Sequence, residues 1–217
     1  MDSLHQSPFG RTVGVGGLLL IAGVLTLVPW IGLFVTGAPQ LNPATNPGGV
    51  ARLVTGPTHF IVGNIYIIGL LFLLFGVLAI NARVASTSGG TWVGVGLVLA
   101  IVAITLVIGV WIVLTYVDAV IGDAYQGGNH GVGPLFSSMS GGRWSLWFVP
   151  LFVVGGLSGL VAAVALGTGL WRSGSFGKGM AIAFGLAFAL SIVSAPIFSI
   201  VGALMLIVVG IVIARSG

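Results

Sequence analysis

The sequence of 217 residues contains no cysteine and very few charged residues. The absence of cysteine excludes disulfide bonds, thiolate zinc sites, cysteine-ligated iron–sulfur clusters and a cysteine nucleophile. Asp, Glu, Lys and Arg together make up 5% of the residues, whereas 57% are hydrophobic. A soluble domain carries about 25% charged residues, so this chain has too few to cover a water-exposed surface, and it is too apolar for disorder. The composition predicts a protein whose solvent is the lipid bilayer.

Acidic residues are the scarcest charged group, and they are Asp2, Asp118 and Asp123. This scarcity explains the formal net charge of +4. The seven basic residues are isolated from one another, so the sequence has no polybasic patch and gives no indication of nucleic-acid binding. No charged residue lies well inside an expected membrane span, although ion-coupled transport and proton relays normally rely on such residues.

Five apolar runs reach the roughly 20 residues that a helix needs to cross a bilayer. The last run, from Gly179 to Ala214, has 36 residues and is too long for one span. Proline disfavours a helix through the residue before it, so Ser194-Ala195-Pro196 predicts a break. The sequence therefore predicts an all-α integral membrane protein, one domain over residues 1–217, with six transmembrane helices at about 12–36, 58–80, 92–116, 146–171, 179–193 and 197–214. A single kinked last helix, which would give five spans, is the alternative.

The distribution of basic residues predicts the orientation, because cytoplasmic loops carry an excess of Lys and Arg. With both termini inside, two basic residues are outside (Arg52 and Arg143) and five are inside (Arg11, Arg83, Arg172, Lys178 and Arg215). We therefore expect a multi-pass protein of the cell membrane with cytoplasmic termini. Tryptophan favours the two interfaces, and the spacing of the residues predicts belt positions for Trp30, Trp92, Trp111, Trp144, Trp147 and Trp171.

Small residues recur every fourth position on two consecutive spans. Helices in lipid associate through close contact that small side chains permit. The ladder on the fourth span is Gly155, Gly159, Ala163 and Gly167, and the ladder on the fifth is Gly177, Ala181, Gly185 and Ala189. The short connection between these spans makes them antiparallel neighbours, so we expect the two ladders to pack against each other. With 37 glycines in the chain, such ladders also arise by chance.

Two histidines are the main candidates for chemistry. His59 begins the second span and His130 lies in the second outer loop, so they could meet together with Asp118 or Asp123. Such a group would suit a transition metal, and two imidazoles could hold a haem. Their spacing is not diagnostic, so the simpler expectation is an interfacial His59, a loop His130 and no metal or cofactor.

The expected outer loops, residues 37–57 and 117–145, are long and contain few large apolar side chains. Ordering each residue costs about 1–2 kcal/mol of backbone entropy, so we expect other membrane subunits to order these loops. The favoured function is a non-catalytic accessory or scaffold subunit of a larger membrane complex. A small channel or uncoupled transporter for a neutral solute is the first alternative. A membrane redox or metal subunit that uses His59 and His130 is the second.

Overall fold

The computed structural model describes residues 14–35, 44–136, 145–193 and 196–216, and these residues form helices and turns without a strand. Five helices are long and apolar enough to cross a membrane. They are α2 (Val15–Val35), α4 (Pro57–Val84), α5 (Gly90–Gln126), α7 (Ser145–Arg172) and α9 (Pro196–Ser216). Three shorter helices accompany them: α3 (Pro47–Thr55), the 3-10 helix η2 (His130–Val132) and α8 (Lys178–Ile192). The chain is thus a helical protein of the multi-pass membrane type.

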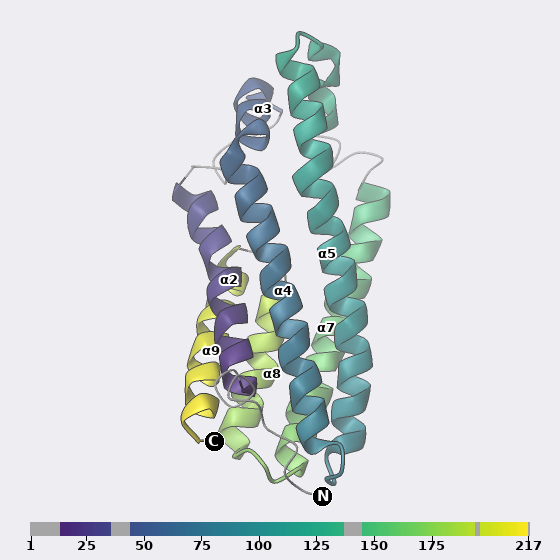
Figure 1. Ribbon diagram of the computed structural model, residues 1–217. Coiled ribbons are helices and arrows are strands. Elements are labelled where there is room, and N and C mark those ends of the chain that lie inside the picture. The colour runs from purple at the N-terminus through teal and green to yellow at the C-terminus, as the bar shows by residue number, and fades with distance from the viewer. Residues whose placement is uncertain (1–13, 36–43, 137–144, 194–195, 217) are drawn as a thin grey trace, which may run out of the picture.

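Contacts between neighbouring helices close the bundle into a ring in chain order, and Figure 1 shows this bundle from the side. Each of α2, α4, α5, α7, α8 and α9 packs on the next, and α9 returns to pack on α2. Glycine makes this closure possible. A methyl group on Gly210 of α9 would lie 2.6 Å from the backbone nitrogen of Leu20 and 2.7 Å from the carbonyl oxygen of Gly16. The backbones of α2 and α9 therefore meet with no side chain between them.

The ring has two distinct ends. The terminal end is where α2 begins and α9 ends, and the cap end is the opposite one, where α3 and the last turns of α5 lie (Figure 1). Apolar side chains fill the middle of the ring, among them Leu70, Leu73, Phe184 and Phe188, each with 0% exposure. Among the described residues, the middle of the ring is therefore a packed core.

The last apolar run forms two helices, α8 and α9, which pack against each other as a hairpin. A methyl group on Gly202 of α9 would lie 2.6 Å from the backbone nitrogen of Ser191 in α8. The Ser199 hydroxyl donates a hydrogen bond of 2.9 Å to the carbonyl oxygen of Val193. This arrangement differs from one kinked helix. The 15 residues of α8 extend about 22 Å, which is less than the roughly 30 Å of a hydrocarbon core.

Parts of the two expected outer loops are helical, which corrects the sequence-based expectation. Pro47–Thr55 forms α3, where Pro47 begins the helix and the Asn46 side chain accepts a hydrogen bond of 2.9 Å from the backbone nitrogen of Gly49. Helix α5 continues to Gln126, ten residues beyond the expected end at position 116. At 37 residues, α5 is about 55 Å long, so it projects well beyond one membrane thickness.

Candidate functional site

The helix α3 and residues 117–136 form a small folded unit, which we call the cap. Its apolar core consists of Ala51, Val54 and Phe136, each at most 5% exposed, with Val50, Ile121 and Tyr125 packed against them. The Gln126 side-chain amide donates to the Ala51 carbonyl oxygen at 3.1 Å and to the Thr55 hydroxyl at 2.6 Å. Contacts within the chain hold this described part of the two outer segments together, and binding of a partner subunit to these segments stays a prediction.

The projecting part of α5 exposes an apolar strip. Tyr116, Val117 and Val120 are 46%, 37% and 69% exposed. Val120 follows Tyr116 by four residues and Val117 by three, and these spacings place it beside both on the helix surface. Counted from Trp92, about 30 Å of helix ends near position 112. With Trp92 at one boundary of the hydrocarbon core, as the sequence predicts, Val120 would lie roughly 12 Å beyond the other boundary.

The candidate metal ligands lie at separate places. The His59 ring nitrogen Nε2 is 3.3 Å from the Leu114 carbonyl oxygen, and the His130 ring lies 4.7 Å from the Tyr125 ring. Positions 114 and 125 on α5 are about 16 Å apart along the helix axis. A metal site would require at least three His, Cys, Asp or Glu side chains close together. Among the described residues there is no such group, and neither Asp118 nor Asp123 belongs to one.

An aromatic cluster lies inside the ring between α2, α4 and α5. The Trp30 and Trp111 rings are 5.8 Å apart, and Tyr66 contacts both rings at 6.0 and 4.5 Å. Trp30 is 6% exposed. Trp30 and Trp111 thus pack on one another within the protein, a contact that the expected belt positions did not predict. Trp92 and Trp171, by contrast, are 41% and 52% exposed.

Three polar atoms of this region are buried without a hydrogen-bond partner. They are the indole nitrogens of Trp30 and Trp111 and the hydroxyl oxygen of Thr115. Other hydroxyls in the bundle behave differently: Thr26 and Ser191 donate to the carbonyl oxygen four residues earlier, both at 2.8 Å. A buried polar group that lacks a partner costs about 1–3 kcal/mol. These atoms are therefore candidates for contact with a small polar ligand or water, which the sequence pattern did not reveal.

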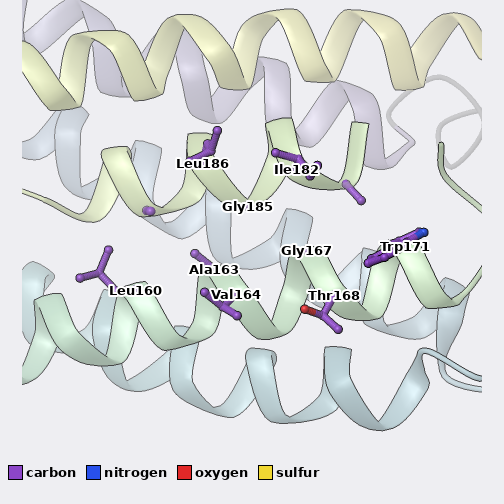
Figure 2. Close-up of a pocket in the computed structure, with 11 residues that line it drawn as sticks. Leu160, Ala163, Val164, Gly167, Thr168, Trp171, Ile182, Gly185 and Leu186 are labelled. Atoms are coloured by element: carbon purple, nitrogen blue, oxygen red, sulfur yellow. The ribbon is translucent and has the colours of Figure 1, made fainter. Parts of the chain in front are cut away.

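An open groove of about 460 Å³ runs between α7 and α8 on the outer surface of the ring, as Figure 2 shows. Its floor consists of small residues, namely Ala163, Gly167, Ala181, Gly185 and Ala189. Larger exposed side chains border it: Leu160, Val164, Trp171, Ile182 and Leu186. The Thr168 hydroxyl and the Trp171 indole nitrogen are the polar atoms of an otherwise apolar lining.

The floor of the groove is where the structure places most of the two small-residue ladders. A methyl group on Gly185 would lie 2.9 Å from the Ala163 carbonyl oxygen, and one on Gly167 would lie 3.2 Å from the Ala181 carbonyl oxygen. These four residues hold α7 and α8 close together. The rest of the ladders is divided among other surroundings, because Gly155 faces Leu106 of α5, Gly159 faces Ile192, and Gly177 has open space around its Cα.

Comparisons of the chain with protein-family models, with curated proteins and with solved structures found no match. The cap, the aromatic cluster and the groove are the features of the molecule that indicate its function.

Proposed function

We propose that the chain is a six-span protein of the cell membrane that acts as a non-catalytic accessory subunit of a larger membrane complex. Its partners bind the outer segments 37–57 and 117–145, of which the cap is the described part. In this proposal both termini are cytoplasmic, and the short helix α8 counts as the fifth of the six spans.

The orientation is supported by the charges at the two ends of the ring. Among the described residues, the connections and helix ends at the terminal end carry Arg83, Arg172, Lys178 and Arg215, whereas Arg52 is at the cap end. The positive-inside rule then favours a cytoplasmic terminal end and an outward-facing cap. The hairpin of α8 and α9 returns the chain to the terminal end, in agreement with an even number of spans.

The observation that carries the proposal is the exposed apolar strip of Tyr116, Val117 and Val120 on a cap that orders itself. An apolar patch that extends beyond the hydrocarbon core and remains uncovered marks a protein-contact site. Because the cap is already folded, a partner that binds it loses less conformational entropy than one that must order a loop. The partner chemistry that fits is an apolar protein surface bordered by polar groups.

Site-specific photocrosslinking in the native membrane tests this proposal. A photoreactive amino acid at Val120 should form a covalent adduct with another protein chain. The same amino acid at Val98, which is 61% exposed in the first third of α5, is the matched control and should react with lipid. If Val120 and Val98 give the same lipid adducts, or if the chain purifies from mild detergent as a lone monomer, the accessory-subunit proposal fails.

A second candidate function is the binding of a small neutral solute, and the unpartnered atoms of Trp30, Trp111 and Thr115 favour it. Two indole N–H groups and a hydroxyl would suit a ligand that accepts hydrogen bonds. The packed core around Leu70 and Phe188 favours binding over passage in this conformation. Solute flux in liposomes, compared between the wild type and Thr115→Val, tests this candidate, and flux that is absent or unaffected by the substitution argues against it.

A further inference from the structure

The length of the groove between α7 and α8, measured along the helices, matches the thickness of one leaflet of a bilayer. Leu160 and Trp171 line its two ends and are 11 residues apart on α7, which is about 16 Å along the helix. Half of a hydrocarbon core is about 15 Å. Trp171 is 52% exposed near the end of α7, where tryptophan favours the headgroup level. The groove therefore runs from the interface at the terminal end to the middle of the membrane.

The width and lining of the groove suit a hydrocarbon chain. Small residues form its floor, so the two helix backbones lie close to its base, and Leu160, Val164, Ile182 and Leu186 border it (Figure 2). A transmembrane helix of a partner would need a complementary face across both leaflets, whereas this groove covers one. An acyl chain matches both the length and the apolar lining.

Lys178 contacts a residue at the interfacial end of the groove, and Arg172 lies at the same end of α7 beside α5. The Lys178 ammonium nitrogen lies 4.4 Å from the centre of the Trp171 ring, and the Arg172 guanidinium lies 5.3 Å from the centre of the Trp92 ring. Cation–π contacts of this kind keep the charged groups beside the aromatic rings. The described carboxylates, Asp118 and Asp123, are at the other end of α5, so in the described structure no acid neutralises these two cations.

We propose that this groove binds an anionic phospholipid of the leaflet at the terminal end. One acyl chain lies along the small-residue floor, and the phosphate headgroup lies beside Lys178, with Arg172 adding positive charge at the same end of α7. The apolar groove supplies the chain contacts and the two cations select an anionic headgroup over a zwitterionic one. This inference is independent of the accessory-subunit proposal, because it concerns a different face of the ring.

Quenching of Trp171 fluorescence by brominated lipids tests the site. The full chain is reconstituted in phosphatidylcholine vesicles with brominated phosphatidylglycerol or brominated phosphatidylcholine. The Trp171 signal is the difference between the wild type and Trp171→Phe. We expect the anionic brominated lipid to quench this signal at a lower mole fraction in the vesicle than the zwitterionic brominated lipid. Each Lys or Arg near an anionic lipid contributes about a fivefold preference for that lipid over a zwitterionic one. The double variant Lys178→Ala, Arg172→Ala should therefore lower the preference about 25-fold.

Two matched controls separate this site from general lipid contact. Arg215→Ala removes a cation at the same end outside the groove and should leave the preference unchanged. Ala189→Phe obstructs the floor and should weaken quenching. Ala183→Phe on the same helix, in the groove between α8 and α9, should not weaken it. Thermal unfolding of every variant verifies that it is folded.

Three results would overturn the proposal. The first is equal quenching by the zwitterionic and anionic brominated lipids. The second is a loss of preference for Arg215→Ala as large as that of the double variant, which would indicate surface charge alone. The third is disulfide formation between two copies of Thr168→Cys in this cysteine-free chain, which would assign the groove to a second copy of the protein.

Discussion

Substitution of Gly185 by alanine tests how closely α7 and α8 approach each other. The added methyl group would lie 2.9 Å from the Ala163 carbonyl oxygen, about 0.5 Å short of ordinary contact, which begins at 3.4 Å. The obstacle is a backbone atom in the middle of a helix, so it cannot rotate away, and the two helices must separate. Overpacking of this kind costs about 1–3 kcal/mol. Alanine also regains about 0.8–1.0 kcal/mol of helix propensity, so we expect a net destabilisation of about 1 kcal/mol.

Gly156→Ala on α7 is the matched control. A methyl group there meets nothing within 4 Å, so the propensity gain stands alone and we expect a stabilisation of about 0.5–1 kcal/mol. The two variants should differ by about 2 kcal/mol, which corresponds to about 4–8 °C in Tm for a chain of this size. Circular dichroism during heating in a mild detergent measures this difference. Tm shifts of the same sign and size for both variants would refute a backbone-to-backbone contact at Gly185.

Three further predictions concern other parts of the molecule. Gly159→Leu should destabilise the bundle more than Leu160→Ala in a detergent-resistance assay. A Cβ atom at position 159 would lie 2.7 Å from the Ile192 side chain, whereas Leu160 is 47% exposed. Equal tolerance of the two substitutions would contradict this prediction. Phe136→Ala should destabilise the cap by about 3 kcal/mol and make it sensitive to protease while the transmembrane helices stay folded. If the cap and the transmembrane helices unfold together, the cap is not a separate cooperative unit. A single thiol introduced at Gly217 should be protected from an impermeant reagent on intact cells, and labelling there would overturn the cytoplasmic C-terminus.

Composition and residue order determined the kind of protein and the positions of its helices. Backbone groups in lipid must be hydrogen-bonded within their own segment, so a long apolar run can only be a helix. The expected spans at 58–80 and 146–171 correspond to α4 and α7, which begin and end within four residues of those limits. Pro196 predicted the division between α8 and α9 because proline cannot continue the preceding helix. These predictions depend on local chemistry that each segment carries by itself.

The tertiary structure decided which face of each helix meets which neighbour. A helix in lipid is apolar on both its buried and its exposed side, so hydropathy does not separate the two. For this reason hydropathy alone did not reveal that Trp30 and Trp111 pack on Tyr66 inside the ring. The same ambiguity divided the ladder of α7, whose Gly155 faces α5 while Gly159 faces Ile192 of α8.

The cap shows the same limit in the water-exposed part of the chain. The sequence contained the signals for α3, an asparagine cap followed by Pro47, but in a segment rich in turn residues they were not sufficient to predict a helix. Val54 and Phe136 are 82 positions apart in the sequence, and each belongs to a short segment with few large apolar residues. They form a core only because α3, the end of α5 and the segment that follows it come together in space. Local pattern determined the helices, and contacts between distant residues determined the cap, the aromatic cluster and the groove.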